Sequence, residues 1–131
     1  MEQSLRIFRV VLQVSDLEAA ARFYGALLGA KGRLVGGGRL YFDCGGVLLS
    51  LQATGRKPRA NGDELYFAVP RLATFHARAK KLGCLSSADV HGAPAGAMVE
   101  RPWGERSFYA QDPDGNGLCF VDERTLFTGR R

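Results

Sequence analysis

The sequence has few histidines and cysteines, and its cysteines follow no disulfide or zinc-binding pattern. Its 131 residues include only two histidines and three cysteines, and no Cys-x-x-Cys motif occurs. Cysteines that are odd in number and widely spaced argue against both a disulfide framework and a structural zinc site. No apolar run approaches the ~18 residues of a membrane-spanning helix, and the N-terminus lacks the pattern of a secretory signal. These absences predict a cytoplasmic protein with no membrane partner.

Acidic residues are outnumbered by basic ones, which gives a formal net charge of +5. The basic residues are scattered, and the densest cluster is Arg56-Lys57-Pro58-Arg59 in an expected loop. A nucleic-acid-binding protein usually concentrates such charge on one face, with interleaved aromatic residues or a recognisable module. We therefore expect no nucleic-acid partner, and a preference for neutral or anionic ligands.

The first half of the chain predicts one strand, one helix and three short strands. Residues 7–14 alternate as a strand, Ser15-Asp16 offers a helix N-cap, and apolar positions at helical spacing continue to Gly29. Glycine turns then separate short strands, which are expected at about 32–35, 39–43 and 47–52.

The second half repeats this order. A strand is predicted at 65–69, and a helix is expected to begin at Pro70 and to stop at Gly83. Three more strands are expected at about 86–90, 105–111 and 117–122. The sequence therefore predicts a single α+β domain over residues 1–131 that is built of two βαβββ modules, at about 6–53 and 63–123. Neither half has enough sheet to close a concave face alone, so the modules should form a curved mixed sheet with a cup inside and the helices outside.

Two groups of motifs stand out in the sequence. The first is VLQVSDL at 11–17 with Phe23-Tyr24 and Leu28-Gly29, and the second is Pro102-Trp103-Gly104, Phe108, DPDGN at 112–116 and Phe120-Val121. Together they resemble the vicinal-oxygen-chelate superfamily, which includes glyoxalase I, extradiol dioxygenases and bleomycin resistance proteins. The first group is similar to the opening signature of that family, and the second is closer to its bleomycin resistance branch. The likeness covers residues 6–122, and the superfamily hosts many unrelated chemistries.

The resemblance implies a metal site with four inward positions, which fall here on Arg9, Ser50, Glu64 and Cys119. A permanently charged guanidinium opposes a divalent cation, a serine hydroxyl is a weak donor, and a thiol suits only soft metals. We therefore expect no metal and no other cofactor. Arg9 and Glu64 are expected instead to form an ion pair at the floor of the cup, the alternative being that both lie exposed at its rim.

The predicted ligand-binding residues share the cup. Strand alternation places Val11 and Gln13 with Arg9, and Tyr66 with Glu64. Trp103 is expected either to stack on the ligand or to pack under its loop or at a dimer contact. Cys119 is expected to be either a small buried thiol or, beside the guanidinium, a reactive one. Gln52 and Arg106 are expected either to contact the ligand near the mouth of the cup or to lie on its solvated rim. The full set of predicted ligand-binding residues is Arg9, Val11, Gln13, Ser50, Gln52, Glu64, Tyr66, Trp103, Arg106 and Cys119.

These expectations predict a metal-free homodimer that binds a small organic molecule, such as an antibiotic or a toxic metabolite. One alternative is a lyase, isomerase or dioxygenase that uses a divalent ion. Another is metal-independent catalysis, with Glu64 as general base or Cys119 as nucleophile.

Overall fold

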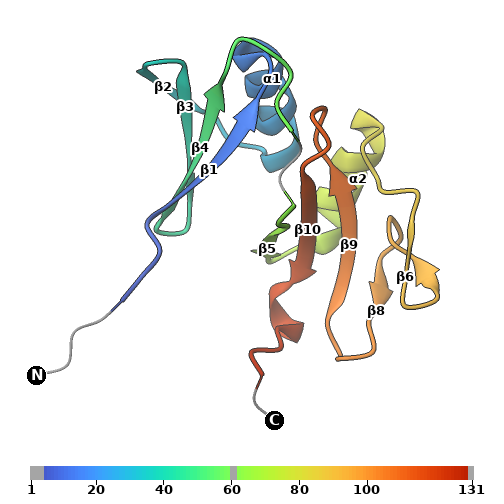
Figure 1. Ribbon diagram of the computed structural model, residues 1–131. Coiled ribbons are helices and arrows are strands. Elements are labelled where there is room, and N and C mark those ends of the chain that lie inside the picture. The colour runs from blue at the N-terminus through green and yellow to red at the C-terminus, as the bar shows by residue number, and fades with distance from the viewer. Residues whose placement is uncertain (1–4, 60–61, 130–131) are drawn as a thin grey trace, which may run out of the picture. The chain divides into compact units, whose positions relative to one another are not determined.

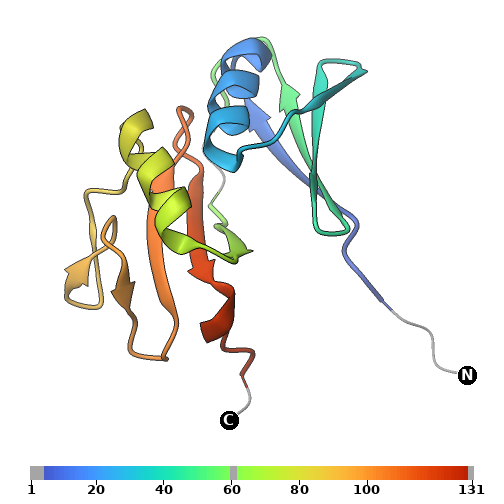
Figure 2. The same cartoon turned by 180° about the vertical axis from the view of Figure 1, so that it is seen from behind.

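The chain folds into two compact units, residues 1–60 and 61–131. A computed structural model describes residues 5–59 and 62–129 (Figures 1 and 2). In each unit one helix packs on one face of a four-stranded mixed sheet. Among the described residues, the opposite face of each sheet carries no α-helix of its own unit, so each sheet has a helix face and an open face (Figure 1).

The first unit has the strand order β1-β4-β3-β2, in which β1 is parallel to β4 and the remaining pairs are antiparallel. Its elements are β1 (Arg9–Val14), α1 (Leu17–Leu28), β2 (Arg33–Gly36), β3 (Arg39–Cys44) and β4 (Val47–Ala53).

Helix α1 begins and ends where its local chemistry predicts. The Asp16 side chain accepts a hydrogen bond from the Ala19 N–H at 3.1 Å, and Gly29 ends the helix in the left-handed conformation with φ 67°. The helix buries Tyr24 against the sheet, where its ring centroid lies 6.4 Å from that of Phe42. Leucines of three strands complete this core: Leu12, Leu40, Leu49 and Leu51.

The second unit repeats the arrangement with the strand order β5-β10-β9-β8, and β6 and β7 pair with each other in a separate small hairpin. Its elements are β5 (Leu65–Val69), α2 (Leu72–Leu82), β6 (Asp89–Val90), β7 (Ala93–Pro94), β8 (Val99–Glu100), β9 (Arg106–Gln111), β10 (Gly117–Asp122) and the 3-10 turn η1 (Glu123–Thr125).

Aromatic rings fill the helix face of this second sheet. Phe120 is fully buried, and it stacks between Phe67 and Phe108 with ring centroids 5.0 and 5.2 Å away. Phe75 of α2 packs on Phe120 at 5.5 Å, and the His76 ring stands edge-on to Phe108 at 5.0 Å. The helix is therefore held to its sheet mainly by aromatic contacts.

The predicted α+β class and the two βαβββ modules are confirmed, but three elements have wrong limits. Strand β1 begins at Arg9 and not at residue 7. Helix α2 begins at Leu72 rather than Pro70, because Arg71 still has an extended φ of −135°. The strand expected at 86–90 shrinks to β6, since the chain reverses at His91 and Gly92, both with positive φ, and β6 pairs with β7. Strand β8 takes the fourth place in the sheet instead.

Neither helix in the described part of the chain is long and apolar enough to cross a membrane.

Candidate functional site

Five of the predicted ligand-binding residues lie together on the open face of the first sheet. Strand register pairs Val11 with Ser50 and Gln13 with Gln52, and alternation along β1 puts Arg9 on the same face. Arg9, Val11, Gln13 and Gln52 are exposed there, whereas Ser50 is only 1% exposed. The serine therefore forms part of the floor of this face and does not project from it.

Arg9 has a partner that the sequence did not suggest. One terminal nitrogen of its guanidinium donates a hydrogen bond to the Tyr41 hydroxyl at 3.1 Å, and its central carbon lies 5.0 Å from the Phe8 ring. Tyr41 comes from β3, opposite Ser50. Alternation within residues 39–43 could have placed Tyr41 on this face, but its position beside Arg9 depends on the β3–β4 register.

Three more predicted residues gather on the second unit. Cys119 on β10 lies opposite both Tyr66 of β5 and Tyr109 of β9, so the three share the open face of that sheet. The Tyr66 hydroxyl donates to a carboxylate oxygen of Glu64 at 3.4 Å and lies 3.3 Å from the Tyr109 hydroxyl. Glu64, Tyr66 and Tyr109 thus form a chain of polar groups. Arg9 and Glu64 belong to different units, and their ion pair stays a prediction.

Burial makes two groups on this face, the Cys119 thiol and the Tyr109 hydroxyl, poor acids. It raises the pKa of the Cys119 thiol to about 12, an effect that hydrogen bonds from Ser107 and Tyr109 reduce only in part. Burial also raises the pKa of the Tyr109 hydroxyl, and the hydrogen bond to Tyr66 raises this pKa further. Both groups are protonated at neutral pH, which favours the interpretation of Cys119 as a buried thiol.

A buried arginine covers part of this face, and nothing in the sequence singled it out. Arg101 is 2% exposed, and its guanidinium lies 5.2 Å from the centre of the Tyr109 ring. Its nitrogens donate to the Ser107 hydroxyl and carbonyl, both at 3.0 Å, and to the carbonyls of Pro94, Ala95 and Ala97 at 3.2 to 3.5 Å. Arg101 therefore ties residues 94–97 to β9. The carbonyl of Gly96 in the same segment lies 2.9 Å from His76 Nε2 of α2.

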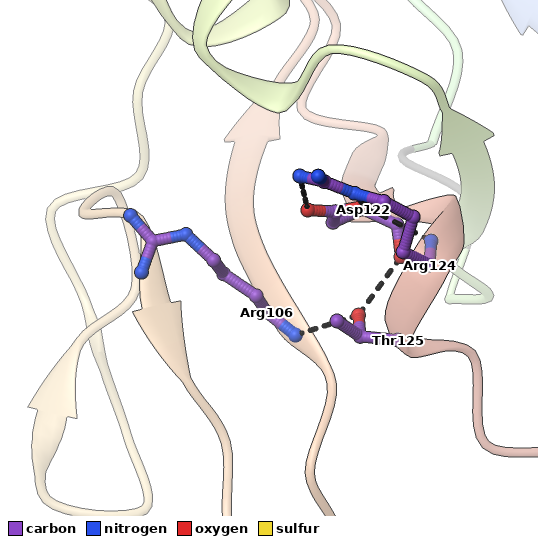
Figure 3. Close-up of polar contacts among 4 residues, drawn as sticks. All are labelled: Arg106, Asp122, Arg124 and Thr125. Carbon is purple, nitrogen blue, oxygen red and sulfur yellow. Dashed lines mark hydrogen bonds and ion pairs between the residues drawn. The ribbon is translucent and has the colours of Figure 1, made fainter.

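The two remaining predicted residues, Trp103 and Arg106, make their contacts apart from the polar groups of Glu64, Tyr66 and Tyr109. Trp103 sits in the turn between β8 and β9, donates to the Glu105 carboxylate at 2.7 Å and contacts the His91 ring edge-on. Arg106 begins β9, and its backbone N–H donates to the Thr125 hydroxyl at 3.0 Å. Figure 3 shows the Arg106 guanidinium pointing away from the neighbouring Asp122–Arg124 pair. Its predicted role as a ligand contact stays a prediction.

The Asp122–Arg124 pair makes a pH prediction. Hydrogen bonds from the Arg124 guanidinium and backbone lower the pKa of Asp122 to about 2, below its ordinary 3.8 (Figure 3). A carboxyl with a lowered folded-state pKa stabilises above its unfolded-state pKa and loses that contribution as pH falls through the folded-state value. We expect the Asp122→Asn variant to lose less free energy of unfolding between pH 4 and about pH 2 than the parent. Urea unfolding across this range measures the difference, and Glu100→Gln, at an exposed site on β8, is the control. Parallel pH profiles for parent and Asp122→Asn would contradict the assignment.

The side chains at the four implied metal positions do not fit a catalytic divalent ion. In residues 5–59 and 62–129 no cluster of three or more His, Cys, Asp or Glu side chains could hold a metal. Arg9 carries a permanent positive charge, Ser50 is buried, and the Cys119 thiol is protonated, which leaves Glu64 as the one anionic donor of the four.

Two surface hollows lie apart from the predicted ligand residues. One, of about 790 Å³, runs beside α1 and is lined by Leu17, Ala21, Leu34 and other residues of the first unit. The other, of about 380 Å³, lies between α2 and the segment around Ser86 and Pro94. None of the ten predicted ligand residues lines either hollow.

Several solved structures share this fold. Oxidase ChaP-H1 is 22% identical, with 97% of this chain and 100% of that chain covered and a TM-score of 0.76. A glyoxalase/bleomycin resistance protein from Albidiferax ferrireducens is 24% identical, with coverages of 88% and 98% and a TM-score of 0.70. Lactoylglutathione lyase from Agrobacterium tumefaciens is 22% identical, with coverages of 92% and 96% and a TM-score of 0.66.

Likenesses at these identities concern the fold and carry no activity over to this chain. The sequence profile of one family, in contrast, matches residues 6–120, which is most of the chain. The protein therefore belongs to the Glyoxalase/Bleomycin resistance protein/Dioxygenase superfamily.

Proposed function

We propose that this protein binds a small organic molecule and does so without a divalent metal ion. The observation that carries the proposal is the chemistry of the four implied metal positions, where a guanidinium, a buried hydroxyl and a protonated thiol accompany a single carboxylate. Binding alone needs affinity and no Lewis acid, so this set of side chains is compatible with sequestration of a ligand.

The motifs shared with the bleomycin resistance branch favour an antibiotic or a toxic metabolite as the ligand. The net charge of +5 disfavours cationic bleomycin itself and favours a neutral or anionic molecule. We further propose that the protein acts as a homodimer in the cytoplasm, as the family likeness and the lack of a cysteine framework suggest.

Metal analysis of the purified protein tests this proposal. We expect plasma mass spectrometry to find nickel, zinc, iron and manganese far below one ion per chain. A thermal-shift screen of antibiotics and aromatic acids, run in chelator, is expected to find stabilising ligands. One tightly held transition-metal ion per chain, together with ligand binding that chelator abolishes, would contradict the proposal and favour a metal-dependent lyase, isomerase or dioxygenase.

The polar groups of Glu64, Tyr66 and Tyr109 on the second unit favour one further candidate function, metal-independent proton transfer. The Glu64 carboxylate accepts from Tyr66, whose hydroxyl lies 3.3 Å from that of Tyr109, so Glu64 lies beside two hydroxyls that can exchange protons with it. For any ligand that the screen finds to be turned over, Glu64→Gln should abolish turnover and leave affinity unchanged. Equal turnover in the parent and in Glu64→Gln would remove this candidate.

A further inference from the structure

The positive charge of the chain is concentrated in its first unit. Residues 1–60 contain nine Lys and Arg against four Asp and Glu, whereas residues 61–131 contain nine of each class. The net charge of +5 therefore arises within the first unit. An anionic ligand is attracted to this half of the chain more strongly than to the other.

The open face of the first sheet carries three of these cations and one anion. By register, Arg33, Arg39 and Asp43 lie on the same face as Arg9. Arg33 is neutralised by two hydrogen bonds to the Asp43 carboxylate, and Arg39 Nε donates to the Gly36 carbonyl at 3.2 Å. Arg9 has only a neutral hydroxyl and a ring as partners within the described residues. Among the described residues of the first unit, Arg9 is thus an arginine whose partner is a hydroxyl that can itself donate, and no carboxylate of that unit pairs with it.

Arg9 and Tyr41 are arranged to donate to one anion. The bond to Tyr41 uses one of the five N–H groups of the guanidinium, and the phenol that accepts this bond keeps its own O–H for donation. A guanidinium fork matches the two oxygens of a carboxylate, and hydrogen bonds between charged partners are stronger than neutral ones. A carboxylate is therefore the group that this pair fits best.

Apolar surface borders the pair. Phe8, whose ring faces the guanidinium, is 55% exposed, and Val11 on the same face is 46% exposed. The Phe8 carbonyl accepts from the Leu48 N–H at 2.7 Å, so the residue is held beside β4. A flat apolar group attached to the carboxylate can cover this surface and remove it from water.

From these contacts we propose that Arg9 and Tyr41 bind the carboxylate of an aromatic acid on the open face of the first sheet. Phe8 and Val11 contact its ring. This inference rests on the proposed function, and it narrows the ligand to one chemical class.

Calorimetric titration of the protein with benzoate, benzamide and benzylamine tests the inference, with a metal chelator present in each buffer. The three probes share a ring and differ in charge, and benzoate is expected to bind most tightly. Arg9→Gln should weaken benzoate binding by roughly 10-fold or more, because a hydrogen bond to a charged group contributes about 1.5–3 kcal/mol. Tyr41→Phe, which removes one donor but leaves the Arg9 charge in place, is expected to weaken benzoate binding measurably and by less than Arg9→Gln does.

Two matched variants complete the design. Arg22→Gln removes the same charge from the exposed side of α1 and should leave the benzoate affinity within about twofold of the parent, since exposed charges act weakly at a distance. Arg9→Lys keeps the charge but loses the fork, and its affinity should fall between the parent and Arg9→Gln.

The inference fails if benzoate does not bind, if benzamide binds equally well, or if Arg22→Gln weakens benzoate as much as Arg9→Gln does. These results leave the metal content untouched and therefore do not bear on metal-free binding of another ligand. If the protein held one metal ion per chain and bound benzoate only with that ion, the proposed function itself would be overturned.

Discussion

The Arg101→Ala variant is expected to lose about 3 kcal/mol of its free energy of unfolding. The parent side chain is 2% exposed and donates to four backbone carbonyls and the Ser107 hydroxyl. Removing it leaves buried acceptors without donors and detaches residues 94–97 from β9. Urea unfolding monitored by circular dichroism measures the loss.

Two variants separate the hydrogen-bond network from the charge. Arg101→Lys keeps the charge but cannot reach all of these acceptors, so its loss should be smaller than that of Arg101→Ala but still measurable. Arg71→Ala removes an exposed arginine at the start of α2 and is expected to change stability by less than about 0.5 kcal/mol. If Arg101→Ala were as mild as Arg71→Ala, the guanidinium would not hold this segment.

Cys119 is expected to react with iodoacetamide roughly a thousandfold more slowly than an ordinary thiol at pH 8. Thiolate is the reactive form, and burial raises the pKa of this thiol to about 12 from the ordinary 9.0. The Cys44→Ser/Cys84→Ser double variant leaves Cys119 as the only thiol, and mass spectrometry of timed samples gives its alkylation rate.

The same double variant is also alkylated in about 6 M guanidinium chloride, which unfolds even very stable domains. This measurement gives the alkylation rate of Cys119 when the thiol is exposed. The Cys44→Ser/Cys119→Ser variant provides a native comparison, because Cys84 is only partly buried. Native Cys119 should be the slowest of the three. Alkylation of native Cys119 as fast as in denaturant would revive its interpretation as a nucleophile.

Local chemistry was enough to predict most of the fold. The N-cap at Asp16 and the left-handed Gly29 mark the ends of α1, and the limits of β5 and β10 agree with the predicted 65–69 and 117–122. The strand expected at 86–90 was wrong because alternation does not reveal which strand a segment pairs with. The left-handed pair His91-Gly92 folds β6 onto β7, and this pairing depends on tertiary context.

The candidate site was predictable only as far as strand alternation reaches. Alternation put Val11 and Gln13 with Arg9, and the structure places all three on one face. It did not bring Tyr41 to Arg9, because that contact depends on the register of a third strand. Arg101 was missed for another reason, since the residue type predicts exposure and only the carbonyls of a distant segment make its burial favourable.

Titration with an aromatic carboxylate, before and after the protein is loaded with manganese or nickel, shows whether ligand recognition needs a divalent ion. Ligand recognition by a guanidinium and a phenol needs no divalent ion. We therefore expect benzoate to bind the chelator-treated protein, and its affinity to be unchanged when either ion is added in excess. Binding that appears only with the ion, and that persists in Arg9→Gln, would contradict the account.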